Sequence, residues 1–237
     1  AFELYDTYGF PYELTEEICA DRGISLDKEA FRQEMERQRE RARAASKHAT
    51  SRVEGTVYTE LHNEFGDTTF DGYSVTEEEA TIQAIVAGGQ RVASASEGQE
   101  VEIVLNRTPM YAEGGGQVGD TGVISEENAR VAVKNTVAPA ERLEAHQAVI
   151  EAGSIAEGDS VHVAVDTERR QAVRRHHTST HILHEALIQV LGPHVRQSGS
   201  LVAPDLLRFD FTHFAPVTEE ELREVERIAN REILNNT

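Results

Sequence analysis

Cysteine, proline and glycine are all scarce in this sequence, and each scarcity excludes a class of protein. The 237 residues include one Cys, 6 Pro and 17 Gly. A single Cys cannot form an intrachain disulfide, which excludes a disulfide-stapled secreted scaffold and favours a reducing compartment such as the cytoplasm. The Pro and Gly contents are far below those of collagen-like or low-complexity chains. No apolar run approaches the roughly 18 residues that a membrane-spanning helix needs.

Basic side chains are outnumbered, but not evenly along the chain. The sequence carries 42 Asp and Glu residues against 23 Lys and Arg, a formal net charge of −19. Taken alone, this charge argues against a nucleic-acid partner, which is itself an anion. The excess is concentrated in residues 51–159, which carry a net −14, whereas residues 160–215 carry a net +1 and seven of the ten His. This shift in composition predicts a separate unit with its own chemistry.

The sequence is 39% hydrophobic, which is enough to build a core, and its hydrophobic pattern divides it into three parts. Residues 1–50 have a helical period, with Asp27 as a helix cap. Residues 51–165 switch to a period of two interrupted by Gly-containing turns, which is typical of a small barrel or sandwich. Residues 166–237 combine helical periods with short strands. We therefore predict an α+β protein, and interpret it as an excised piece of a longer chain because it begins with Ala1 and ends directly after a helix.

The same pattern predicts individual elements. We expect barrel strands over residues 55–60, 81–87, 100–105, 122–124, 130–133, 146–150 and 160–165. A helix is expected over residues 167–191, since Gly192-Pro193 is a strong stop signal. Two further strands are expected over residues 201–202 and 206–211. Thr218 and Glu221 form a capping box, which predicts the start of a last helix.

The motif with the clearest chemistry is a pair of His residues four positions apart. His177 and His181 lie one turn apart on one face of the predicted helix. This spacing allows two imidazoles to reach one Zn²⁺ ion, and the local density of His favours a metal site over a polar face with incidental His. A zinc site normally has three or four ligands, so the others are either another His nearby, such as His184, or residues outside this sequence.

A glycine-rich loop follows the middle of the barrel segment. Four glycines within residues 114–119 let backbone N–H groups approach a ligand closely. The loop lacks the Gly-Lys-Ser/Thr of a phosphate-binding P-loop, and a tight turn between strands accounts for its composition. Gln117 is not explained by such a turn, which makes it a candidate binding residue.

An Arg-rich stretch precedes the His pair. Arg169, Arg170, Arg174 and Arg175 cover one broad face at the start of the predicted helix. Arg near a helix N-terminus opposes the helix dipole, so this placement indicates a phosphate partner rather than a solvated helix start alone. The polar segment 197–200 is either a simple loop or a further part of the same site.

Several linked motifs together resemble alanyl-tRNA synthetase in its editing region. In chain order they are TYGFP at 7–11, PMYAEGGGQVGD at 109–120, HTSTHILH at 177–184, QSGSLV at 197–202 and LRFDFTH at 207–213. The resemblance covers nearly the whole chain. Each motif alone is weak, but their number and order make the resemblance specific.

The resemblance implies a fold and an activity. The implied fold is a translation-factor-like barrel (51–165) between the helical tail of a tRNA-recognition domain (1–50) and the first part of an editing domain (166–237). This editing domain is of the second additional domain type shared with threonyl-tRNA synthetase. The implied activity is hydrolysis of Ser-tRNA(Ala) or Gly-tRNA(Ala), in a cytoplasmic enzyme that attaches alanine to tRNA(Ala). ATP and Mg²⁺ would serve only an aminoacylation core upstream of this sequence.

The resemblance also implies roles for residues. His177 and His181 would be two zinc ligands, and a Cys-x-x-x-His pair further downstream would supply the others. An alanine pocket cannot strongly exclude Gly or reject an added hydroxyl, which is why a second, hydrolytic site is needed. We expect Thr180 to pair with the serine hydroxyl and Gln197 to hold the substrate amine or the terminal ribose. The remaining candidates for binding the tRNA end are Gly115, Gly116, Gln117, Arg174, Arg175 and Ser200.

Two other hypotheses stay open. A free-standing editing hydrolase of the same superfamily would share these motifs, although residues 1–47 argue against it. A non-catalytic binding module, an acidic barrel with an incidental His-rich helix, would bind neither zinc nor RNA. For the sequence by itself we expect a monomer that is inactive without the missing zinc ligands. Its tRNA binding should be weak and salt-sensitive, because only residues 160–215 do not repel an anion.

Overall fold

The computed structural model describes residues 15, 19, 22–23, 26–28, 30–33, 37 and 52–235. The chain forms two compact units, Ala1–Arg52 and Val53–Thr237. Most of the helical segment expected at 1–47 lies outside the described residues. Where it is described, Asp27 caps a helical segment as predicted, since its Oδ1 accepts a hydrogen bond from the Ala30 backbone N–H at 2.9 Å. No helix among the described residues is long and apolar enough to cross a membrane.

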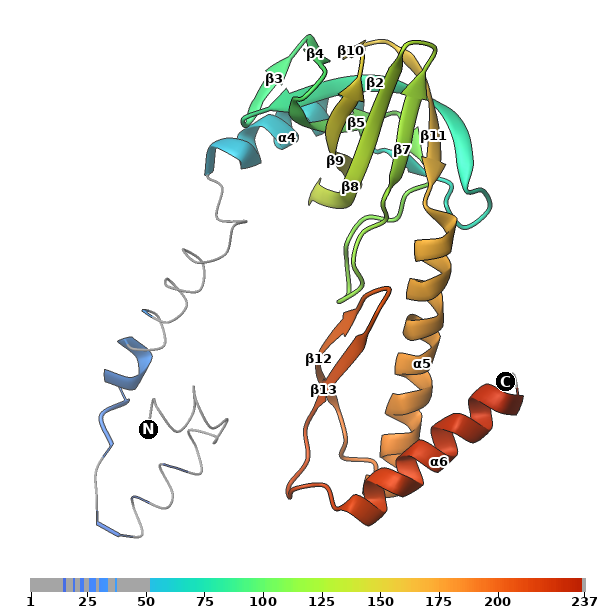
Figure 1. Ribbon diagram of the computed structural model, residues 1–237. Coiled ribbons are helices and arrows are strands. Elements are labelled where there is room, and N and C mark those ends of the chain that lie inside the picture. The colour runs from blue at the N-terminus through green and yellow to red at the C-terminus, as the bar shows by residue number, and fades with distance from the viewer. Residues whose placement is uncertain are drawn as a thin grey trace. The chain divides into compact units, whose positions relative to one another are not determined.

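A closed β-barrel of six antiparallel strands forms the first half of the second unit (Figure 1). In ring order its strands are β2 (Glu77–Ala87), β5 (Glu100–Leu105), β9 (Leu143–Ala152), β8 (Ala129–Ala140), β7 (Gly122–Glu126) and β11 (Ser160–Val165). The sheet closes because β2 pairs with β5 along one edge and with β11 along the other. Aliphatic side chains that alternate along the strands, such as Ile103, Ile124 and Val163, fill the interior. The predicted α+β class and barrel are confirmed.

Short strands complete the two ends of the barrel. A hairpin strand, β3 (Gln90–Val92), extends β2. At the same end β4 (Ser94–Ser96) pairs with β10 (Ser154–Ala156). Elsewhere β1 (Thr69–Phe70) runs parallel to β6 (Arg107–Thr108) and leads into the segment before β2. These strands were not expected from the sequence, because two or three residues are too few to show a period of two.

The first element of this unit is a helix, and here the sequence prediction is wrong. Residues 55–60 were expected to form a strand, but they lie within α4 (Arg52–Phe65). Tyr58 and Leu61, three positions apart, are buried against Val86 and Leu143 on the outer face of the barrel. This spacing is the helical one, whereas a strand would have buried alternate residues. The barrel wall beneath α4 therefore carries apolar side chains on both its inner and its outer face.

A long helix leads away from the barrel and supports the rest of the chain (Figure 1). α5 (Thr167–Leu191) follows β11 directly and ends at Gly192, as predicted. Asp166 caps its N-terminus. It is followed by the hairpin of β12 (Gln197–Val202) and β13 (Leu207–Phe211). α6 (Glu219–Asn235) begins with the predicted Thr218–Glu221 capping box.

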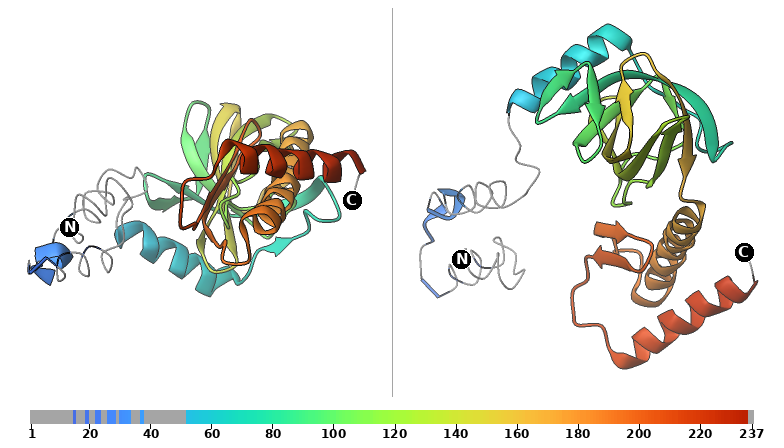
Figure 2. Two further views of the ribbon diagram at one scale, coloured as in Figure 1. Left: turned by 90° about the horizontal axis from the view of Figure 1, so that it is seen from below. Right: turned by 45° about the horizontal axis from the view of Figure 1, so that its top comes forward.

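These elements share a small core at the end of α5 away from the barrel (Figure 2). Leu187 of α5 packs there with Val225 and Ile228 of α6, and Phe209 and Phe211 of the hairpin pack against them. The hairpin and α6 thus share a core with α5.

Candidate functional site

The glycine-rich loop leaves the barrel between β6 and β7 and reaches the hairpin (Figure 1). Its tip is closed by reciprocal backbone hydrogen bonds between Gly114 and Gln117, at 3.1 and 2.9 Å. Beyond the tip, Val118 N–H donates to the Val202 carbonyl at 3.1 Å and Val202 N–H donates to the Gly116 carbonyl at 2.8 Å. The loop therefore adds a short parallel strand segment to β12.

Gly116 is required at this contact by its surroundings. Its φ is +85°, a backbone conformation that side chains disfavour. A Cβ atom at this position would also lie 2.6 Å from the Ser200 carbonyl oxygen, so any side chain would push the loop away from β12. Gly115 has φ +59° but open space around it. The Ser200 hydroxyl donates to the Gly115 carbonyl at 3.4 Å, which brings two of the predicted tRNA-binding residues together.

A buried ion pair fixes the base of the same loop to α5. The Arg170 guanidinium donates to Asp120 Oδ2 and to the backbone carbonyls of Gly72 and Pro109. Asp120 Oδ2 also accepts the Tyr111 backbone N–H at 2.7 Å, so the carboxylate closes the loop on itself. Arg169 donates to the Gly119 carbonyl at 2.8 Å. For Arg170 the expectation of a phosphate partner is therefore wrong, because its donors are occupied by the protein. For Arg169 the expectation stays a prediction, since only one of its donors is known to bind the loop.

The first His of the predicted metal pair contacts the loop. His177 Nδ1 lies 2.7 Å from Gln117 Oε1. With the amide oxygen as acceptor, Nδ1 carries the proton and Nε2 presents its lone pair. The His181 ring lies beside it, with the two centroids 5.2 Å apart and the planes at 21°. Both residues are exposed, so a ligand or a water molecule can reach their rings. We call the place where residues 114–120, α5 and β12 meet the loop–hairpin junction.

These two imidazoles meet the needs of a zinc ion only in part. The hydrogen bond from Nδ1 to a side-chain oxygen is the arrangement that orients metal-binding His residues. However, the described residues contain no cluster of three His, Cys, Asp or Glu that could hold a metal ion. His184 packs its ring against Phe209, with centroids 4.9 Å apart. The donor set in the described part of the chain is therefore two ligands, short of the three or four that zinc takes.

The two predicted catalytic residues lie on different elements of the junction, Thr180 on α5 and Gln197 on β12. Thr180 is 8% exposed, and its hydroxyl donates to the His176 carbonyl at 2.8 Å, one turn back in α5. The hydroxyl oxygen keeps lone pairs that can accept a hydrogen bond. Gln197 begins β12 on the exposed side, and its Nε2 donates to Ser200 Oγ at 3.2 Å. Gln197 thus belongs to the same hydrogen-bonded chain as Ser200 and Gly115.

A cavity of about 500 Å³ opens between the barrel and the first turns of α5. His177, Gln117 and Arg174 line it, whereas Arg175 is exposed outside its wall. On the barrel side the wall includes three aromatic residues, Phe70, Tyr73 and Tyr111. Burial raises the pKa of the Tyr111 hydroxyl, so it stays protonated and able to donate at neutral pH.

Sequence reasoning missed part of this arrangement. Tyr73 and Phe70 lie in no motif and follow no periodic pattern, so no signal in the sequence singled them out. Asp120 ends the quoted loop motif, but nothing in the sequence paired it with Arg170, which lies 50 residues further on. A single acidic residue directly after a glycine-rich loop was the only available hint of a buried partner.

Comparison with known proteins identifies the family of the chain. A family model described as tRNA synthetases class II (A) matches residues 1–169. Curated alanine–tRNA ligases from Desulforudis audaxviator and Sinorhizobium medicae are each 48% identical over 100% of the chain. One from Rhodopseudomonas palustris is 47% identical over the same share. The chain spans about a quarter of the length of these relatives, 26 to 27%. The chain therefore belongs to the family of class II (A) tRNA synthetases and is similar over its whole length to alanine–tRNA ligases.

Proposed function

We propose that the loop–hairpin junction is an editing site that hydrolyses the ester of Ser-tRNA(Ala) or Gly-tRNA(Ala). One observation carries this proposal. Polar residues from three segments, Gln117, His177 and Ser200, meet there although 60 and 85 residues separate the contacting pairs. A contact that only joined two parts of a fold would not need two exposed imidazoles beside a glycine-lined backbone edge.

The names of the relatives support the substrate and the wider activity. We propose that tRNA(Ala), above all its aminoacylated 3′ end, is the partner. The whole protein would attach alanine to it with ATP and Mg²⁺ in the cytoplasm, at a site these residues do not form. In this proposal residues 51–165 are a translation-factor-like barrel, and residues 166–237 begin an editing domain of the type shared with threonyl-tRNA synthetase.

The residues at the junction suit ester hydrolysis. Water attacks the ester carbonyl, and the bond between the carbonyl carbon and the terminal ribose oxygen breaks. The released ribose oxygen takes a proton from the attacking water and becomes a hydroxyl. The lone pair on His177 Nε2 can accept a proton from water or bind a metal, because Gln117 holds the other ring nitrogen. Gln197 and Ser200 present amide and hydroxyl groups to the substrate amine or ribose. Thr180 can accept a hydrogen bond from the hydroxyl of a serine substrate, whereas glycine has no hydroxyl to pair.

Zinc remains part of this proposal with an incomplete ligand set. His177 and His181 would hold the ion together with ligands from outside the described residues. When bound, a zinc ion orients the substrate and places or activates the attacking water. The oriented imidazole of His177 supports this role, and the lack of a third ligand in the described part of the chain limits it.

The test measures hydrolysis of Ser-tRNA(Ala) by the full-length product of the gene that carries this sequence. We expect His177→Ala and Gln197→Ala each to lower the rate at least about 100-fold, as expected for groups that act in the transition state. Matched controls are His162→Ala, on the barrel surface, and Gln189→Ala, whose side chain donates to Glu185 one turn back in α5. Full activity in both junction variants would refute the site assignment.

Thr180 gives a sharper test because it should act on one substrate only. Thr180→Val removes the hydroxyl at nearly constant volume. We expect it to slow hydrolysis of Ser-tRNA(Ala) about 10-fold or more and to leave Gly-tRNA(Ala) unaffected, since only serine has a hydroxyl to pair. Equal losses on both substrates would show that Thr180 acts through helix structure rather than through the substrate.

A further inference from the structure

The cavity beside the loop–hairpin junction has a wall that the proposed hydrolysis does not use. Its barrel side is formed by the segment that joins β1 to β2, together with Tyr111. Its helix side is formed by α5 residues that precede His177. The volume of about 500 Å³ falls within the range of small-molecule and nucleotide pockets, roughly 300–1,000 Å³.

Aromatic rings are concentrated on the barrel side of this cavity. Phe70 packs edge-on against Tyr73, with centroids 5.1 Å apart and planes at 81°, and against Tyr111 at 6.1 Å and 71°. Phe70 therefore contacts both tyrosine rings. Tyr73 is 88% exposed, so almost all of its ring surface meets solvent. An exposed ring of this size that contacts another aromatic ring along one edge is typical of a binding surface rather than of a core.

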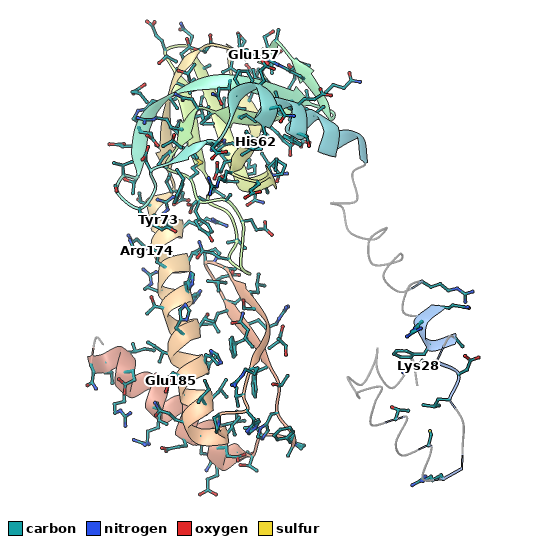
Figure 3. The ribbon with its side chains drawn as sticks, turned by 180° about the vertical axis from the view of Figure 1, so that it is seen from behind. Lys28, His62, Tyr73, Glu157, Arg174 and Glu185 are labelled. Atoms are coloured by element: carbon teal, nitrogen blue, oxygen red, sulfur yellow. The ribbon has the colours of Figure 1, made fainter. Side chains whose placement is uncertain are left out.

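The charge of the cavity is supplied by one side chain on α5. Asp120 and Arg170 also line the wall, but they neutralise one another in a buried ion pair. Arg174, one turn further along the helix, is exposed, and no carboxylate in residues 52–235 forms an ion pair with it. Figure 3 shows Tyr73 and Arg174 next to each other where the barrel meets α5. A free guanidinium beside a supported aromatic ring is the combination that binds single-stranded nucleic acid.

We infer that this cavity binds the single-stranded 3′ end of RNA, with a base stacked on Tyr73 and a phosphate paired with Arg174. Gln117 and His177 line the same cavity and also form the junction, so an RNA strand that places one base on Tyr73 continues directly into the junction. The identity of that RNA as tRNA(Ala) rests on the proposed function. The stacking site itself rests on the rings and the guanidinium.

The experiment uses an uncharged acceptor-stem minihelix of tRNA(Ala) with 2-aminopurine at one of its single-stranded 3′ positions, titrated with the 237-residue chain. We expect stacking to quench the emission of one labelled position on binding. Tyr73→Ala should abolish this quenching and raise Kd about 10-fold or more, while Tyr73→Phe should preserve both. A control minihelix that lacks the single-stranded 3′ end should bind the wild type and Tyr73→Ala with the same Kd.

Arg174→Ala supplies the second arm. It should raise Kd and lower the slope of log K against log salt by about 1, as the loss of one phosphate contact does. The charge-matched control is Arg130→Ala, which removes an exposed cation of β8 that is paired with Glu151, and it should change neither. Melting temperatures equal to the wild type would confirm that these exposed substitutions leave the fold intact.

Quenching that is unchanged in Tyr73→Ala, or absent in the wild type, would overturn the inference. This result differs from failure of the proposed function. Loss of Ser-tRNA(Ala) hydrolysis in His177→Ala with normal binding in Tyr73→Ala would keep the editing site and reject the stacking site. Conversely, a minihelix that binds through Tyr73 to a full-length protein without deacylase activity would keep the stacking site and reject the editing function.

Discussion

At the scale of single residues, His146 is an imidazole held neutral inside the barrel. It is fully buried, with Nδ1 2.8 Å from the Ile103 carbonyl and Nε2 2.8 Å from Thr108 Oγ1. Because a carbonyl can only accept, Nδ1 carries the proton and Nε2 accepts from the threonine hydroxyl. That hydroxyl oxygen in turn accepts the Met110 backbone N–H at 3.1 Å. A second proton on the ring would be a buried charge, and burial lowers the pKa of His146 to about 4.

This arrangement predicts how stability depends on pH. Below pH 6.5 the unfolded chain binds a proton at this ring, whereas the folded chain does so only near pH 4. The contribution of His146 is therefore constant above pH 6.5 and falls by about 3 kcal/mol as the pH decreases to 4. His146→Gln can keep both hydrogen bonds without titrating. Urea denaturation from pH 7 to pH 4 should show a smaller loss in the variant, and parallel profiles would contradict the assignment.

At the scale of elements, the ion pair between Asp120 and Arg170 decides how the barrel meets α5. It ties the base of the glycine-rich loop to the first turn of α5, while the tip of the loop pairs with β12. The loop thus contacts α5 and β12 at once. His177 lies two turns further along α5 and meets Gln117 because both ends of the loop are fixed. The geometry of the loop–hairpin junction therefore depends on a salt bridge between two buried side chains.

We predict a large cost for breaking this ion pair from one side. Arg170→Met leaves the Asp120 carboxylate buried without its partner and should lower the free energy of unfolding by about 3–5 kcal/mol. Arg169→Met, which loses one hydrogen bond to a backbone carbonyl, should cost about 1 kcal/mol. The double variant Asp120→Asn/Arg170→Met should recover part of the loss. Urea denaturation measures all three, and equal losses in the two single variants would rule out a dominant role for the pair.

At the scale of the whole molecule, the net charge of −19 does not exclude an RNA partner. The acidic excess belongs mainly to residues 51–159, the region of α4 and most of the barrel, whereas residues 160–215 are nearly neutral. Arg174 and Arg175 add exposed positive charge next to the cavity. Such a distribution attracts an RNA strand to one place and repels it from the rest, which restricts how it can approach.

The charge distribution predicts weak and salt-sensitive RNA binding by the 237-residue chain. Affinity for the tRNA(Ala) minihelix should fall as salt rises, with a slope that reflects a few phosphate contacts. Arg175→Ala should reduce that slope by about 1, and Arg223→Ala, an exposed cation paired with Glu219 on α6, should leave it unchanged. Fluorescence titration over a series of salt concentrations gives these slopes, and binding that is tight and independent of salt would contradict the prediction.

Much of the fold could be predicted from the sequence because it depends on local patterns. The bounds expected for β5, β11 and α5 agree with the structure, since a period of two or of 3.6 is visible within one element. The Thr218–Glu221 cap likewise needs only residues three apart. By contrast, residues 55–60 of α4 include Val57, Tyr58 and Thr59, which are residue types that favour strands. Only packing against the barrel shows that Tyr58 and Leu61 are the buried pair.

For the candidate site, the sequence by itself determined which residues are candidates. His177 and Gln117 were identified from residue type and spacing and Ser200 from the family resemblance, and the family is confirmed. Tertiary structure alone decided that these motifs meet, that Arg170 pairs with Asp120 instead of a phosphate, and that Tyr73 stands exposed beside Arg174. The physical reason is that periodicity and spacing describe a residue's neighbours along the chain. Contacts across 50 or more residues depend on how a closed barrel and a long helix place separate segments together.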